Sequence, residues 1–133
     1  MLKFLLPLAI SVALSPASGA VADTRDKTVK FEAGANAAHY RDTIHGYDAV
    51  NYYLDARAGQ SMSIDFEKSR NSCYFNVLSP VEGETIHMGS AGEDAFDGIL
   101  KESGKYRVVV YLMRASARRG ASCKFSIGFE ITN

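Results

Sequence analysis

The sequence has 133 residues, with 15 lysines and arginines against 15 aspartates and glutamates, and its formal net charge is zero. This balance argues against a nucleic-acid-binding protein, because such proteins carry an excess of basic residues. The length suffices for one domain with its own core and leaves no room for a second large one.

Residues 1–22 are typical of a secretory signal peptide. A short positively charged start is followed by an apolar run over residues 4–14, and small residues precede a cleavage point after Ala20 or Ala22. The apolar run is too short to span a bilayer. We therefore expect residues 23–133 to be exported to the periplasm as one domain, with no membrane insertion after cleavage.

Apolar residues alternate with polar residues in several short runs, and this period of two predicts half-buried strands. The runs cover residues 29–31, 50–56, 62–66, 73–77, 106–112 and 123–131. Glycines fall between the runs, as expected for turns, and no window longer than a turn has a helical pattern. The sequence predicts an all-β protein, a compact antiparallel β-sandwich of six to eight short strands.

The two cysteines, Cys73 and Cys123, fall in phase with the inward residues of their runs. In an exported protein they are expected to form one disulfide inside the sandwich, with a pair of free buried thiols as the alternative. The three histidines, His39, His45 and His87, have no ligand spacing to the cysteines or to one another. We therefore expect neither a metal site nor a cofactor.

Charge is distributed unevenly along the chain. Residues 82–102 have a balance of −5, whereas residues 105–124 contain six basic residues and no acid. The acidic charge lies mostly in residues 79–98, which show no alternation and are predicted to form a loop. This loop is either a solvated face or a surface that steers a cationic partner.

Catalytic signatures are missing from the sequence. It contains no nucleophile motif, no zinc-protease motif and no glycine-rich phosphate loop. The carboxylates are concentrated on the predicted solvated loop and do not form an evident acid–base pair. These observations favour a binding protein over an enzyme.

Besides the acidic loop, three segments are candidates for the binding surface. Tyr47 follows a glycine at the start of a strand, where an exposed ring can anchor a partner, although a core tyrosine is the alternative. Arg114 and Arg118 bracket three small residues on a predicted loop, and Arg119 extends this basic tip. Guanidinium groups placed in this way favour a partner that presents carboxylates, whereas a solvated basic turn is the alternative.

Residues 103–106, with the sequence S-G-K-Y, form a third segment. Gly104 permits a turn with positive φ, and Tyr106 falls on the inward phase of its strand. Ser103 and Tyr106 are either supporting binding residues or parts of an ordinary strand entry.

Several motifs occur in an order and spacing that resemble a known family. They are V-x-F-x-x-G at 29–34, I-x-G-Y-D at 44–48, Y-x-L-x-A at 52–56, S-G-K-Y at 103–106 and R-x-x-A-R at 114–118. Together they cover nearly the whole mature chain. The chain resembles the bacterial periplasmic inhibitors of goose-type lysozyme, the PliG family.

The resemblance implies a β-sandwich that occludes the active-site cleft of goose-type lysozyme, a muramidase. It also implies that Tyr47, Arg114 and Arg118 contact this protein partner, with Ser103 and Tyr106 in supporting roles. The cysteines and the 79–98 segment depart from the family pattern and put the choice of target in question.

Two other interpretations remain at this point. The G-Y-D segment and the strand after it also resemble small β-sandwich modules of the pre-peptidase C-terminal type, which are appended to secreted proteases. On that interpretation the chain is a free-standing carbohydrate- or protein-binding module. A third interpretation is an immunity protein against a muramidase toxin.

Overall fold

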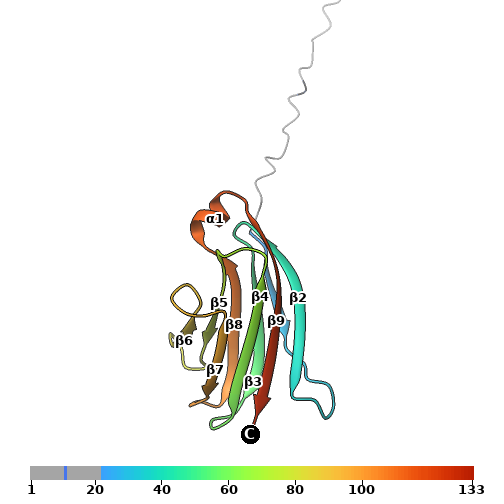
Figure 1. Ribbon diagram of the computed structural model, residues 1–133, viewed down its shortest axis with the longest axis vertical. Helices are drawn as coiled ribbons and strands as arrows, with labels where there is room; N and C mark the ends of the chain where they lie inside the picture. The colour runs from blue at the N-terminus through green and yellow to red at the C-terminus, as the bar shows by residue number, and fades with distance from the viewer. Residues whose placement is uncertain (1–10, 12–21) are drawn as a thin grey trace, which may run out of the picture.

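Two β-sheets pack face to face and enclose one apolar core (Figure 1). The computed structural model describes residue 11 and residues 22–133. The predicted signal peptide, residues 1–22, lies outside the described residues except at positions 11 and 22, so its cleavage point stays a prediction. The elements of the described chain are β1 (Thr24–Thr28), β2 (Ala37–His45), β3 (Ala49–Ala56), β4 (Ser61–Lys68), β5 (Cys73–Leu78), β6 (Thr85–Met88), β7 (Ala95–Ile99), β8 (Gly104–Leu112), α1 (Arg114–Arg118) and β9 (Ser122–Thr132).

One sheet has five strands in the order β1-β3-β8-β5-β6, and the other has four in the order β2-β9-β4-β7. Neighbouring strands are antiparallel, except that β1 and β3 are parallel. The predicted all-β sandwich is therefore confirmed. Within residues 22–133 it has nine strands rather than six to eight, and one edge pair is parallel.

The strands predicted from alternation are present as β3, β4, β5, β8 and β9. In β8 every second side chain, from Tyr106 to Leu112, is at most 5% exposed. Phe66 of β4 and Phe75 of β5 come from opposite sheets, and their ring centroids lie 5.2 Å apart. Each large apolar side chain buried in this way contributes about 1.5–3 kcal/mol, so the alternating runs fix both sheets onto one core.

The strand predicted at residues 29–31 is wrong in position, because β1 ends at Thr28. Val29 is still buried, and its N–H donates to the Tyr53 carbonyl at 2.8 Å beyond the end of the strand. β1 itself contains no apolar residue, and β2 was not predicted. In β2 the alternation is interrupted at Asp42, which lies opposite the buried Phe125 and so faces the inside.

The predicted 79–98 loop contains two short strands, β6 and β7, which form edges of different sheets. Only four residues of these strands are partly buried, because each strand has a single neighbour and little core contact. Such strands leave no period-two pattern in the sequence. The acidic residues of this segment are exposed as predicted, and Asp94 pairs with Lys68 at 2.9 Å.

The predicted disulfide between Cys73 and Cys123 is present and joins the two sheets. Both cysteines are fully buried, and their Cα atoms are 6.3 Å apart. Cys73 begins β5 opposite Leu112, the last residue of β8, whereas Cys123 is the second residue of β9 and lies opposite Ile44. The bond therefore crosses the core beside the connection that leads from β8 to β9.

Removal of the disulfide should lower the stability of the fold. We expect the double variant Cys73→Ala/Cys123→Ala to lose up to about 4 kcal/mol of unfolding free energy, because the unfolded chain regains the entropy of a 50-residue loop. Urea denaturation of the oxidised protein and the variant measures this difference. Wild-type protein reduced with a thiol is the control and should match the variant; equal midpoints for all three samples would contradict the prediction.

Candidate functional site

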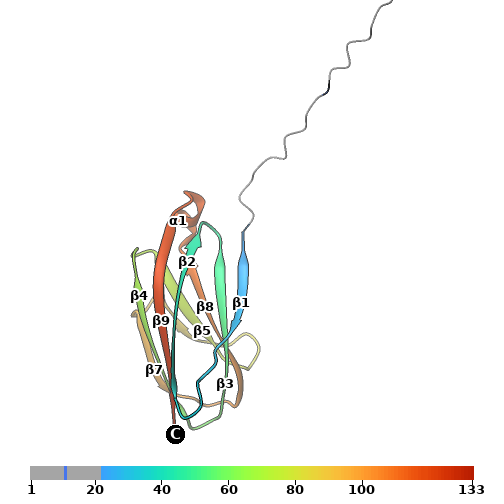
Figure 2. The same ribbon diagram turned by 90° about the vertical axis from the view of Figure 1, so that its right-hand side faces the viewer.

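Two connections between the sheets lie side by side at one end of the sandwich. β2 continues into β3 through residues 46–48, and β8 continues into β9 through α1. β2 is the neighbour of β9 and β3 is the neighbour of β8, so that His45 lies opposite Ser122 and Ala49 opposite Tyr111. Both crossings must therefore occur at the same end of the molecule, as Figure 1 and Figure 2 show.

Tyr47 lies at the tip of the turn between β2 and β3, and 55% of the residue is exposed. Gly46 adopts a φ of +57°, which favours glycine, and its N–H donates to the Ala121 carbonyl at 2.8 Å. A Cβ at Gly46 would lie 3.5 Å from the Ala117 carbonyl oxygen. The turn is thus attached to the segment that follows α1, and the ring of Tyr47 is not part of the core.

The predicted arginine loop is wrong in its conformation, because residues 114–118 form one short helix, α1. No helical pattern was detectable in the sequence, because five residues are too few to show a period. The Ala117 N–H donates to the Met113 carbonyl at 2.9 Å, and Ser116 and Ala117 are buried against the sandwich. Ser72 fixes the helix by accepting from the Met113 N–H at 2.7 Å and by bonding the Ser116 hydroxyl at 2.7 Å.

The helix brings two arginines to one side. Arg114 and Arg118 are four residues apart and therefore neighbours on the helix surface, and Arg119 follows at its C-terminal end. All three residues are exposed, and within the described chain none makes an ion pair with a carboxylate. Like charges at this spacing repel by a few tenths of a kcal/mol, so an anionic partner would remove an unfavourable interaction.

A surface depression of about 480 Å³ lies between the two connections. Its lining includes Tyr47 and Arg118, which are far apart in the sequence, together with Ala22, Asp23 and Asp48. Met113, just before α1, adds an apolar side chain at this end and is 43% exposed. We call this end of the molecule, formed by residues 46–48 and 113–120, the α1 end.

Ser103 and Tyr106 lie at the opposite end of β8 from α1 (Figure 1). The nine residues of β8 extend over about 30 Å. The Ser103 hydroxyl accepts from the Ala58 N–H at 2.8 Å, whereas the buried Tyr106 hydroxyl donates to the Glu102 carbonyl at 2.6 Å. Burial also raises the pKa of Tyr106. The structure does not bring these two residues together with Tyr47 and the arginines, and their polar groups have partners within the chain.

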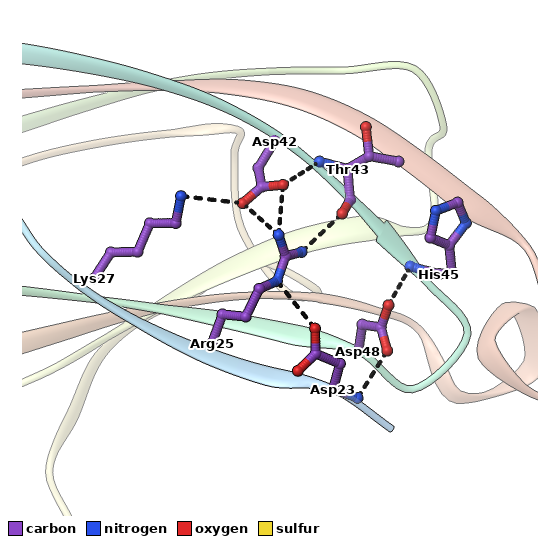
Figure 3. Close-up of polar contacts among 7 residues, drawn as sticks. All are labelled: Asp23, Arg25, Lys27, Asp42, Thr43, His45 and Asp48. Atoms are coloured by element: carbon purple, nitrogen blue, oxygen red, sulfur yellow. Dashed lines mark hydrogen bonds and ion pairs between the residues drawn. The ribbon is translucent and has the colours of Figure 1, made fainter. Parts of the chain in front are cut away.

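An ion pair joins the two sheets beside the β2–β3 turn (Figure 3). The Arg25 guanidinium of β1 donates to both oxygens of Asp42 of β2, at 2.7 and 2.9 Å, and to the Thr43 carbonyl at 2.8 Å. Burial alone would raise the pKa of Asp42. The hydrogen bonds from Arg25 and from the Thr43 N–H, with the charges of Arg25 and Lys27, outweigh burial and hold this pKa below its ordinary value. The hydrogen bond to Asp42 in turn raises the pKa of Arg25.

Asp48 holds the turn itself, a role that the sequence reasoning missed. One carboxylate oxygen accepts from the Asp23 N–H at 2.8 Å and the other from the His45 N–H at 3.0 Å (Figure 3). The Asp48 N–H donates back to the His45 carbonyl at 3.0 Å. The signal for this role was present, because an aspartate after a glycine in a tight turn commonly accepts from nearby backbone N–H groups.

The described residues contain no group of three or more histidine, cysteine, aspartate or glutamate side chains that is arranged for a metal ion. In the same part of the chain, no helix has the length and apolar character needed to cross a membrane.

Comparison with known proteins gives consistent relatives, although no protein-family profile matches the chain. A curated protein of Escherichia coli K12, the inhibitor of g-type lysozyme, is 25% identical over 132 residues, which cover 97% of this chain and 94% of that protein. The crystal structure of Aeromonas hydrophila PliG, a periplasmic lysozyme inhibitor of g-type lysozyme, is 34% identical with a TM-score of 0.76 and covers 84% of this chain and 100% of its own. The corresponding PliG of Salmonella Typhimurium is 27% identical with a TM-score of 0.63 and covers 81% and 98%.

The ion pair between Arg25 and Asp42 should make a measurable contribution to stability. We expect Asp42→Asn to lower the unfolding free energy by about 1.5–3 kcal/mol at neutral pH, because a charge-assisted bond is lost. The folded pKa of Asp42 lies below its unfolded value, so the contribution is present above about pH 4 and is lost as the pH falls through the folded pKa.

Urea denaturation between pH 7 and pH 2 tests this prediction. The stabilities of the wild type and Asp42→Asn should converge at the acidic end. Asp55→Asn, which removes an exposed carboxylate from β3, is the matched control and should change stability little. A constant difference between wild type and Asp42→Asn at all pH values would rule out the assigned linkage.

Proposed function

The chain belongs to the PliG family of periplasmic inhibitors of g-type lysozyme, and from this premise we propose that it inhibits a g-type lysozyme by occluding its cleft with the α1 end. We further infer that it acts in the periplasm, as its relatives do by name. The protein is then an inhibitor and not itself an enzyme. The observation that carries the proposal is the convergence, at one end of the sandwich, of an exposed tyrosine and of arginines that have no ion-pair partner within the described chain.

Lysozymes cleave a glycosidic bond with carboxyl groups that must be free to act as acid or base. Guanidinium groups from Arg114 and Arg118 would pair with such carboxylates and hold them in an unproductive environment. The pairing would be strong in a cleft, because water is excluded there and charge–charge interactions strengthen. Inhibition is therefore expected to be reversible, non-covalent and competitive with the glycan.

Tyr47 provides a different kind of contact. Its ring offers a large contact area with only two side-chain torsions to fix, which is why tyrosine is common at the centres of protein interfaces. The turn that carries it is attached to the segment after α1 through Gly46, so little backbone entropy remains to be lost on binding. Arg119 adds positive charge at the edge of this surface, and we expect a smaller role for it.

The arginine pair should dominate the inhibition constant. We expect the variant Arg114→Ala/Arg118→Ala to weaken inhibition of g-type lysozyme at least 30-fold, the equivalent of about 2 kcal/mol, and Tyr47→Ala to weaken it about 10-fold or more. Lysis of bacterial cell walls at several inhibitor concentrations measures these constants. Arg41→Ala, which removes an exposed arginine from β2, is the matched control and should leave them unchanged.

The same assay with goose-, chicken- and invertebrate-type lysozymes defines the target class, and we expect inhibition of the goose type alone. A pull-down on purified peptidoglycan separates inhibition from carbohydrate binding. If the protein bound peptidoglycan but did not slow g-type lysozyme, the proposal would be wrong and the carbohydrate-module interpretation would replace it. Unchanged inhibition by the double arginine variant would instead reject the α1 end as the contact surface.

A further inference from the structure

The Asp48 carboxylate connects the beginning of β1 with the end of β2 and has Tyr47 beside it. Its two oxygens accept from the backbone nitrogens of Asp23 and His45, as Figure 3 shows. The Asp23 carbonyl in turn accepts from the Ala49 N–H at 3.0 Å, and the Asp23 side chain lies 3.5 Å from the Arg25 guanidinium. Asp23 is therefore held at its backbone nitrogen, its carbonyl and its carboxylate.

The residues before Asp23 have the sequence Ala20-Val21-Ala22, which fits the A-x-A pattern of a signal-peptide cleavage site. Cleavage at this pattern makes Asp23 the first residue of the mature protein. Its backbone nitrogen, which is a neutral amide in the precursor, then becomes an ammonium group. This ammonium would lie at the nitrogen position 2.8 Å from an oxygen of Asp48.

We propose that signal peptidase hydrolyses the bond between Ala22 and Asp23 and that the new ammonium group pairs with Asp48 to position the Tyr47 turn. One water molecule is consumed as the C–N bond breaks. Its oxygen joins the carbonyl carbon of Ala22, which leaves as a carboxylate, and its two protons convert the amide N–H of Asp23 into an ammonium. The consequence for inhibition rests on the function proposed above. Asp48 is a positioning residue, because it acts on the partner through Tyr47.

Processing at this bond changes the α1 end in two ways. The donor changes from a neutral amide to an ammonium, so a charge–charge attraction is added to the hydrogen bond that the Asp48 carboxylate already accepts, and the turn becomes more tightly held. Ala22 also lines the depression beside Tyr47 and Arg118, and cleavage removes it together with every residue attached to it. In the mature inhibitor the depression therefore loses the part of its lining that Ala22 supplies, and the Tyr47 turn gains an ion pair that the precursor lacks.

The cleavage point is tested first. The full-length gene is expressed in a Gram-negative host, and the intact mass of the exported protein is measured by mass spectrometry. We expect the mass of residues 23–133. A protein that begins at Val21 would overturn the proposal, because its Asp23 nitrogen would remain an amide.

A double-mutant cycle tests the ion pair. Four proteins are compared: chains starting at Asp23 or at Val21, each with Asp48 or with Asp48→Asn. With Asp48 present, we expect the unfolding equilibrium constant of the Asp23 chain to be about 2- to 10-fold lower than that of the Val21 chain. Asp48→Asn should abolish this difference. If Asp48 served only as a neutral acceptor for the turn, Asp48→Asn would destabilise both chains equally, and the proposal would fail.

The pH dependence of the same difference provides an independent readout. The ammonium gains a partner on folding, so its folded pKa is raised above the unfolded value of about 8. The advantage of the Asp23 chain is then complete below about pH 8 and is lost as the pH rises through the folded pKa. The charged side chains around this nitrogen are Asp23, Asp42, Asp48, Arg25, Lys27 and Arg118, and His45 is a titratable neighbour; all are present in both chains and cancel in the comparison. An advantage that persisted unchanged to pH 11 would contradict the proposal.

Inhibition assays distinguish this proposal from the proposed function. We expect Asp48→Asn to weaken inhibition of g-type lysozyme by the Asp23 chain several-fold, less than the double arginine variant does, whereas the control Asp55→Asn should have no effect. If Asp48→Asn and the Val21 start leave inhibition unchanged while the arginine variant abolishes it, the positioning role fails and the proposed function stands. If none of the proteins inhibits, the proposed function fails. The intact mass and the double-mutant cycle of unfolding still show whether the ammonium of Asp23 forms and pairs with Asp48.

Discussion

The Cys73–Cys123 disulfide crosses the core between the two sheets at the point where the chain passes from β8 to β9. Leu112 lies opposite one cysteine, and Ile44 lies opposite the other. α1 therefore lies in a connection that leaves the core at Leu112, opposite Cys73, and returns to it at Cys123. The arginines on this short helix would otherwise belong to a mobile surface segment, since five residues do not form a stable helix alone. Core packing and the disulfide together give the α1 end its rigidity.

The meeting of Tyr47 and Arg118 follows from the pairing of the strands. One connection leads from β2 to β3 and the other from β8 to β9, and each passes from one sheet to the other. Because β2 is bonded to β9 and β3 to β8, the two connections are forced to lie next to each other. This strand pairing places both connections at one end of the sandwich (Figure 2).

At the α1 end the acidic side chains have hydrogen-bond partners within the fold, whereas the basic side chains of α1 have no acidic partner in the described chain. The carboxylates of Asp42 and Asp48 are used within the fold, where they accept from Arg25 and from the backbone N–H groups of Asp23 and His45. The arginines of α1 have no acidic partner within the described chain. A chain with no net charge thus presents a positive surface at the α1 end. Such a surface attracts an acidic cleft at a distance and restricts the choice of partner.

The sequence by itself determined the sandwich, the strands with regular alternation and the disulfide. A strand with one face in the core must alternate apolar with polar residues, and both cysteines fall on the inward positions of their strands. The sequence did not determine the four edge strands β1, β2, β6 and β7, since edge strands are held by backbone bonds and by polar contacts that leave no regular apolar period. It indicated Tyr47 and the arginines as separate binding candidates. The family resemblance added Ser103 and Tyr106 as supporting binding residues. Only the tertiary structure decided that Tyr47 and Arg118 line one depression, that the arginines lie on a helix, and that Ser103 and Tyr106 lie at the other end. The reason is that proximity between connections depends on which strands are bonded to each other, and strand order is fixed by the packing of the whole core.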